Sequence, residues 1–217
     1  MEVCSEIATN PEWGLRLMAN GELLPEMEPV IADIVRGMEV YDLGAGDLTY
    51  AKRLLQLGAD RIVAVDKEGF CPSRFRGRAI HAVRTYFQDV QVPPGGIEVA
   101  WVSWPCNRPL PGLTRLLAAS ARVIYMGCNT GGSCCGELPL WDHLTRRRIL
   151  AHVPHFRNSL IVYGDPLPED ERRPLVGEEL AYISGEMMSF DRAQATATEV
   201  ANVIRAVGLG PNGVEGT

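Results

Sequence analysis

Short apolar runs alternate with amphipathic stretches along most of the chain. The runs predict strands at about 39–43, 61–66, 80–84, 97–103, 121–126 and 158–163. The stretches between most of them predict helices at about 48–57, 110–119 and 138–151. Runs such as IVAV and IEVAWV are nearly continuous in apolar residues, as in strands covered on both faces. The alternation predicts an α/β fold with a doubly wound, mostly parallel sheet.

The two ends of the chain depart from this alternation. Short helices are expected at 11–19 and 28–37, and further helical stretches near 177–188 and 191–206. On this pattern 158–163 is the sixth strand and no seventh is visible. Either the sheet has a shortened C-terminal edge, or ISGEMMSF is a strand that resembles a helix.

We find no linker or repeat, so we expect a single domain over residues 1–217. Its expected parts are N-terminal helices at 1–38, a ligand-binding core at 38–165 and a C-terminal helical extension at 166–217.

The most informative segment runs from Glu39 to Glu68, with the sequence EVYDLGAGDLTYAKRLLQLGADRIVAVDKE. An apolar run breaks at Gly44 and Gly46, a helical stretch follows, and a second apolar run ends in Asp66. This succession predicts a βαβ nucleotide-binding unit. Glycines let backbone amides and the helix N-terminus approach a ligand, because they have no Cβ. An acid that ends the second strand can accept both hydroxyls of a ribose.

The segment resembles the first motif of the class I S-adenosylmethionine-dependent methyltransferases, D-x-G-x-G-x-G. Asp42, Gly44 and Gly46 match this motif, whereas Leu48 stands in place of the third glycine. The resemblance implies that S-adenosylmethionine is the cofactor, that Asp42 closes the first strand and that Asp66 holds the ribose.

The same resemblance extends over roughly residues 38 to 165. In this family an acid after the third strand bonds the adenine amino group, and Asp89 in TYFQDV has that place. Taken alone, Asp89 would be read as a turn residue, and its spacing from Asp66 favours the ligand role.

Two other interpretations of the glycine segment remain. A nicotinamide-dinucleotide site would follow the pattern G-x-G-x-x-G/A. Here Thr49 occupies the sixth position, so the third glycine that helps to hold the pyrophosphate is missing. A βαβ unit that binds nothing is also possible, although such a unit does not require Asp66.

The string WVSWPCNRP follows the fourth predicted strand. Amino-group methyltransferases have a tetrapeptide of the type D/N/S-P-P-Y/F/W here, and Ser103 to Cys106 match it in part. We therefore take Ser103 and Trp104 as the candidate catalytic, acceptor-side residues, although Trp104 could equally be a core residue. Cytosine-C5 methyltransferases use a nucleophilic cysteine after a proline, but a pocket-lining Cys106 is the simpler interpretation.

A glycine-rich loop follows the fifth predicted strand, in MGCNTGGSCCGELPLW. Its amides could bind an anion, or the loop could cover the substrate. Cys128, Cys134 and Cys135 invite a zinc interpretation with His143, His152 or His155, but adjacent cysteines do not fit the usual C-x₂₋₄-C pair. We expect no metal. The acceptor pocket is expected between 103–108 and 129–136.

Charge and hydropathy limit the classes of partner that the protein can bind. The formal net charge is −6, whereas nucleic-acid binders usually carry a basic face. The arginines at 74, 76 and 78, at 146–148 and at 172–173 could form an anion-binding patch, but solvated surface is the better interpretation. No apolar run approaches a membrane span, and the N-terminus is no secretory signal. We expect a cytoplasmic protein with reduced cysteines, Cys4, Cys71 and Cys106 among them.

The residues and the resemblance together predict an S-adenosylmethionine-dependent methyltransferase that acts on a small-molecule acceptor. Two alternatives stay open. One is a non-catalytic module that binds S-adenosylmethionine. The other is a nucleic-acid amino-group methyltransferase that uses the tetrapeptide Ser103 to Cys106.

Overall fold

The computed structural model describes residues 23–68, 79–105, 110–127, 136, 138–155, 159–171, 173–176 and 179. Its strands are β1 (Glu39–Leu43), β2 (Arg61–Asp66), β3 (Ile80–Arg84), β4 (Ile97–Ser103), β5 (Ser120–Gly127), β6 (Arg147–Val153) and β7 (Ser159–Pro166). They form one seven-stranded sheet in the order β3-β2-β1-β4-β5-β7-β6. The first five strands are parallel, and β7 runs antiparallel to both β5 and β6. The predicted doubly wound, mostly parallel α/β fold is confirmed.

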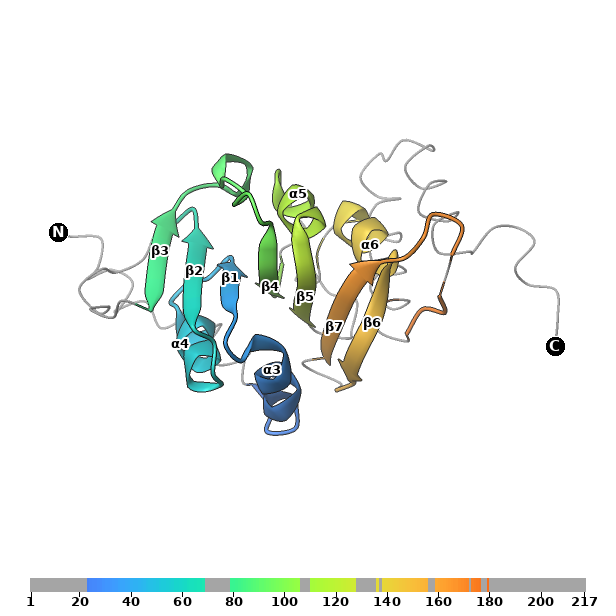
Figure 1. Ribbon diagram of the computed structural model, residues 1–217, viewed down its shortest axis with the longest axis horizontal. Helices are drawn as coiled ribbons and strands as arrows, with labels where there is room; N and C mark the ends of the chain where they lie inside the picture. The colour runs from blue at the N-terminus through green and yellow to red at the C-terminus, as the bar shows by residue number, and fades with distance from the viewer. Residues whose placement is uncertain are drawn as a thin grey trace, which may run out of the picture.

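Helices cover both faces of this sheet (Figure 1). They are α3 (Met27–Val35), α4 (Thr49–Gln56), α5 (Leu113–Ala118) and α6 (Leu138–Thr145), with a 3₁₀ turn, η2, at Phe87–Asp89. Residues of α3 and α4 share one apolar cluster with one face of the strands, and residues of α5 and α6 share a second cluster with the other face. In the described ranges, no helix is long and apolar enough to cross a membrane.

Strand β4 shows how the sheet separates these two clusters. Val99 and Trp101 lie in the α3–α4 cluster, whereas Ala100 and Val102 lie in the α5–α6 cluster, and all four are buried. Side chains alternate between faces along a strand, so a strand buried on both faces must be apolar throughout. This is the physical basis of the continuous apolar runs in the sequence.

The C-terminal edge of the sheet is not shortened, so that prediction is wrong. The predicted helix 138–151 is in fact α6 followed by β6, and the strand expected as the sixth is β7. The hydroxyl of Thr145 bonds the Trp141 carbonyl at 2.8 Å where α6 ends. Strand β6 then pairs antiparallel with β7, with two register irregularities. The segment ISGEMMSF and the helix expected at 11–19 lie outside the described residues.

Arg147 explains why this boundary is hard to see in the sequence. The run Arg146 to Arg148 suggested a solvated surface, but Arg147 is only 1% exposed. Its guanidinium donates to the carbonyl oxygens of Gly164 at 2.6 Å and Leu117 at 2.7 Å, and also to Ser120. Burial lowers the Arg147 pKa, but the backbone carbonyls satisfy the donors. The solvated interpretation is therefore wrong for Arg147, because its side chain joins β5 to β7.

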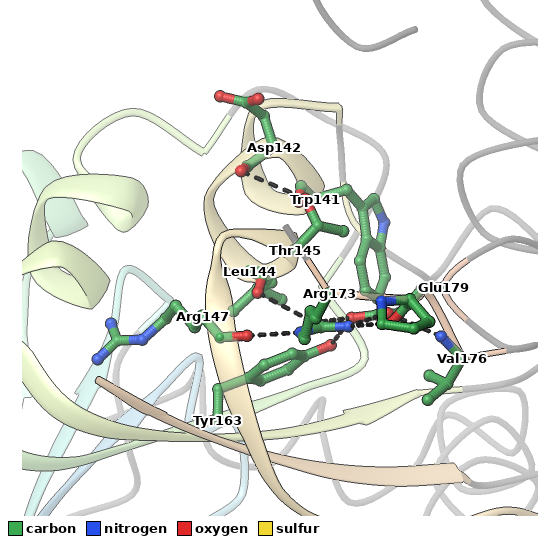
Figure 2. Close-up of polar contacts among 10 residues, drawn as sticks. Trp141, Asp142, Leu144, Thr145, Arg147, Tyr163, Arg173, Val176 and Glu179 are labelled. Carbon is green, nitrogen blue, oxygen red and sulfur yellow. Dashed lines mark hydrogen bonds and ion pairs between the residues drawn. The ribbon is translucent and has the colours of Figure 1, made fainter. Parts of the chain in front are cut away.

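A second buried polar cluster ties the segment after β7 to α6 and β6 (Figure 2). Glu179 is fully buried and forms two charge-assisted hydrogen bonds with Arg173, at 2.8 and 2.6 Å. It also accepts hydrogen bonds from the Tyr163 hydroxyl at 2.9 Å and the Val176 amide at 3.1 Å. Arg173 Nε donates to the Arg147 carbonyl at 2.6 Å. Arg173 is thus a structural residue and not solvated surface.

Candidate functional site

The glycine turn between β1 and α4 is held against the end of β2. The amides of Gly44 and Ala45 both donate to the Val65 carbonyl, at 2.8 and 3.1 Å. The Gly46 amide donates to Asp66 Oδ2 at 3.0 Å, and the Glu68 amide donates to Asp66 Oδ1 at 2.9 Å. Asp66 is half-buried at the end of β2. The carboxylate therefore shapes the turn and still borders the surface above it.

The backbone angles of the turn explain its glycines. Gly44 and Gly46 have φ values of 88° and 50°, a region that L-residues with a Cβ rarely adopt. Added Cβ atoms would meet no atom within 4 Å at Gly46 and only the Phe87 ring, at 3.9 Å, at Gly44. Within the protein itself, φ rather than space requires these glycines.

Leu48 departs from the methyltransferase motif, and the structure shows what the departure does. Its φ is 66°, so the chain keeps the left-handed backbone that a third glycine would adopt freely. Its side chain is fully buried in the α3–α4 cluster. The leucine therefore points into the core and not toward the space above the turn, and packing compensates for the strained backbone.

Asp42 lies beneath the turn and is completely buried. Among the described residues, neither of its carboxyl oxygens has a well-formed hydrogen bond. Burial, and then the charges of Asp66 and Asp47, raise its pKa to about 8, an increase that the Ala51 amide in α4 only partly offsets. The site thus holds three acids, of which Asp42, the deepest, is mostly protonated at neutral pH.

The first turn of α4 adds an aromatic group to this site. Asp47 accepts hydrogen bonds from the amide of Thr49, the first residue of α4, at 3.0 Å and from the Thr49 hydroxyl at 2.8 Å. The Tyr50 ring lies 5.3 Å from the Trp101 ring. Burial raises the pKa of Tyr50, and the charges of Asp42 and Asp47 raise it as well. The Tyr50 hydroxyl is therefore neutral beside the acids.

Ser103 ends β4 and Trp104 follows it, on the other side of the point where the strand order switches from β1 to β4. Ser103 is half-buried. Trp104 has φ 51°, and its amide donates to the Met126 carbonyl at 2.9 Å. Its ring packs on the α3–α4 cluster, where the indole faces the Tyr50 hydroxyl without forming a well-formed hydrogen bond. The structure thus brings Trp104 next to the helix that follows the glycine turn.

Asp89 is the last residue of η2, the segment that follows β3. It is exposed, and its amide donates to the Tyr86 carbonyl at 3.0 Å. Tyr86 itself is 60% exposed, which is unusual for so large a ring. Asp89 and Thr85 line a groove of about 550 Å³ over the β1–β3 face, whose floor includes Tyr41 and Val63.

Part of the predicted acceptor side lies outside the described residues. This holds for the segment from Cys106 to Pro109 and for most of the glycine-rich loop, and the remaining cysteines, Cys4 and Cys71, also lie outside the described residues. Gly136 is described, and a Cβ there would be 3.3 Å from the Pro105 ring, so the two segments meet at this point. Within the described ranges, no three His, Cys, Asp or Glu residues are grouped as metal ligands.

The histidines considered as zinc ligands lie apart from the turn. His143 is in α6, where burial, and then the charge of Arg147, lower its pKa. His152 belongs to β6. The backbone of His155 exchanges hydrogen bonds with the Ser159 hydroxyl, at 3.2 and 2.9 Å.

Comparison with solved structures identifies the fold. The *Burkholderia thailandensis* 1,6-didemethyltoxoflavin-N1-methyltransferase, solved with S-adenosylhomocysteine bound, superposes with a TM-score of 0.53. The alignment covers 75% of this chain and 86% of that one, at 15% identity. This chain has the class I methyltransferase-like fold. A SAM-dependent methyltransferase from *Aquifex aeolicus* shares it, with a TM-score of 0.50, 14% identity and coverage of 74% and 96%. No protein-family model and no curated protein matches the sequence.

The methyltransferase-like fold also shows what the sequence did not reveal. Tyr50 and Tyr86 border the site, yet neither was singled out beforehand. Tyr86 lies two residues after β3, a strand whose residues are half-buried or exposed, so hydrophobic periodicity carried no signal for it. Tyr50 carried none, since its position beside Asp42 depends on how α4 packs on β1.

Proposed function

We propose that this protein is an S-adenosylmethionine-dependent methyltransferase with a small-molecule acceptor. The observation that carries the proposal is the glycine turn, which Asp66 holds at the switch point of a methyltransferase-like sheet. In open α/β sheets, ligands bind in the crevice beyond the carboxyl ends of the strands at this point. Gly44, Gly46 and Asp66 all stand there.

Asp66 is suited to hold a ribose even though it already accepts two hydrogen bonds. An ionised carboxylate has about four acceptor positions. The Gly46 and Glu68 amides occupy one on each oxygen. The remaining positions can accept the two ribose hydroxyls, while the amides fix the carboxylate in place.

The acids around the turn suit a positively charged ligand. When bound, S-adenosylmethionine would supply an activated methyl group on a positively charged sulfur. Burial, and then the charges of Asp66 and Asp47, raise the pKa of Asp42, so the three acids lie close enough to repel one another. A cationic ligand would relieve that repulsion and favour the ionised form of Asp42.

Ser103 and Trp104 are the proposed acceptor-side residues. The left-handed backbone of Trp104 is strained, and such strain is concentrated at functional sites. The proposed role of the Trp104 ring is to position a flat acceptor and exclude water beside the turn. The *Burkholderia* enzyme was solved with 1,6-didemethyltoxoflavin bound, which makes a small acceptor reasonable. Asp89 is proposed to meet the adenine amino group.

Calorimetric titration with S-adenosylmethionine and S-adenosylhomocysteine tests the cofactor, and NAD serves as the control ligand. We expect micromolar affinity for the first two and none for NAD. Binding of NAD alone would overturn the proposal. Trp104→Ala should then impair turnover or acceptor binding more than cofactor affinity.

Two alternatives predict different results in the same assays. A non-catalytic binding module would bind S-adenosylhomocysteine but methylate no acceptor. A nucleic-acid amino-group methyltransferase would methylate oligonucleotides, which the net charge of −6 does not favour. A covalent adduct at Cys106 would instead favour the cytosine-C5 mechanism.

A further inference from the structure

The 3₁₀ turn η2 is held in place by a single side chain from α5. Nη2 of Arg115 donates to the carbonyl oxygens of Phe87 at 3.2 Å, Gln88 at 3.3 Å and Val90 at 2.7 Å. Arg115 itself is exposed. An exposed arginine is usually mobile, so three contacts with one short segment are a specific arrangement.

The start of α5 adds a second constraint on the same turn. Gly112 precedes α5 with φ 89°, and a Cβ there would lie 2.5 Å from the backbone N and Cα of Gln88. Only glycine allows so close an approach. The backbone of η2 therefore rests directly on the start of α5, and Arg115 fixes it from one turn further along.

One residue of η2 comes close to the glycine turn, and another lines the neighbouring groove. The Phe87 ring comes close to Gly44 of the glycine turn. Asp89, the proposed partner of the adenine amino group, is the last residue of η2, and its backbone amide closes the turn on Tyr86. A shift of η2 would move both groups together.

We propose that Arg115 is a positioning residue for the adenine side of the site: by holding the carbonyls of η2, it fixes where the Asp89 carboxylate stands. The inference rests on the proposed function, because it assumes that Asp89 meets the adenine. Arg115 itself touches neither ligand nor reacting atoms. Its effect is on which nucleobase is bound. A carboxylate in a fixed position accepts a hydrogen bond from the amino group of adenine but not from a carbonyl oxygen in the same place.

The test compares S-adenosylhomocysteine with S-inosylhomocysteine, in which a carbonyl replaces the amino group of the base. Wild-type protein should bind the adenine compound at least about tenfold more tightly, the lower range for a hydrogen bond to a charged group. Arg115→Ala should reduce this preference to less than about threefold. Arg115→Lys should restore part of it, because an ammonium can reach a carbonyl but lacks the guanidinium fork.

Two controls separate positioning from general damage. Arg122→Ala removes an arginine of β5 that pairs with Val99, a residue of the α3–α4 cluster, whereas Phe87 of η2 packs against the other cluster, so this change should leave the preference unchanged. Asp89→Asn should abolish the preference, and Arg115→Ala should then change it no further. Thermal unfolding of each variant checks its folding. A loss of global stability alone would weaken both compounds equally and leave their ratio intact.

The outcomes also distinguish this inference from the function on which it rests. If wild-type protein binds neither compound, both are overturned. If it binds both equally, cofactor binding survives, but the role of Asp89 and this inference fail. If the wild-type preference persists in Arg115→Ala, only this inference is overturned.

Discussion

Among the described residues, the carboxyl groups of Glu179 and Asp42 are both completely buried, and their surroundings differ sharply. Glu179 has no exposed surface, yet it receives hydrogen bonds from Arg173, Tyr163 and Val176. Asp42 is equally buried, but neither of its oxygens has a well-formed hydrogen bond among the described residues. The two carboxyl groups are equally buried, but only that of Glu179 has well-formed hydrogen bonds.

This difference separates a structural cluster from a candidate binding site. A buried charge is tolerated when partners replace the water it loses, as they do for Glu179 and also for Arg147. A buried acid without donors is costly and is protonated instead, as the raised pKa of Asp42 shows. The costly burial of Asp42 occurs where the glycine turn meets the switch in strand order. In open α/β sheets, ligands bind at this switch point.

The strongest test of the satisfied cluster is Glu179→Ala. It leaves Arg173 buried without its carboxylate, so we expect the free energy of unfolding to fall by about 3–5 kcal/mol. Urea unfolding at neutral pH measures this loss. Asp170→Ala, at an exposed position of the same C-terminal segment, is the matched control and should change stability by less than about 0.5 kcal/mol. A small effect of Glu179→Ala would show that the cluster is dispensable.

Asp42→Asn should raise the free energy of unfolding, whereas Glu179→Ala should lower it. The folded-state pKa of about 8 lies above the ordinary aspartate value of 3.8, so the folded protein holds a proton that the unfolded chain releases. Stability should therefore fall as the pH rises from about 4 to about 8 and then level off. At pH 7 the variant should be more stable than wild type by about 2–4 kcal/mol, with a flatter pH profile. Equal profiles would mean that Asp42 has a partner in solution.

Asp66→Ala tests a third acid, which is only half-buried, unlike Glu179 and Asp42. It should weaken S-adenosylhomocysteine binding by about 2–3 kcal/mol, because it removes the proposed charge-assisted bonds to the ribose. Calorimetric titration measures the change, and circular dichroism checks that the domain remains folded. Asp60→Ala, just before the same strand and exposed, should bind like wild type. Wild-type affinity in Asp66→Ala would remove Asp66 from the site.

Leu48 offers the finest comparison, because it combines a strained backbone with a buried side chain. Leu48→Ala loses the packing but keeps the strain, and should destabilise by about 2–5 kcal/mol. Leu48→Gly loses the same packing and relieves the strain, so it should be more stable than Leu48→Ala by about 1 kcal/mol. Equal stability of the two variants would show that φ 66° is not strained here.

The parallel half of the sheet could be predicted from the sequence because burial on both faces leaves continuous apolar runs. The residues Asp42, Gly44, Gly46 and Asp66 could be grouped for a related reason, since strand ends and turns fix their places along the chain. Their roles remain predictions, but their proximity is a property of the βαβ unit itself.

The C-terminal edge could not be predicted in this way. Arg147 looks like a surface residue in the sequence, and only the carbonyls of Leu117, Ser120 and Gly164 make its burial favourable. Likewise, the contact of Arg115 with η2 joins segments about 25 residues apart and leaves no periodic signal. Such polar contacts depend on tertiary structure, which hydrophobic periodicity does not describe.

The bonds that hold the glycine turn also bear on the entropy of binding. Gly44, Ala45 and Gly46 each use their amide to attach the turn to the end of β2. Glycines are the residues with the most conformational freedom to lose, at roughly 1–2 kcal/mol of backbone entropy per residue. Here that ordering occurs during folding. A ligand that enters the crevice therefore meets a turn already in shape, and more of its contact energy remains available as affinity.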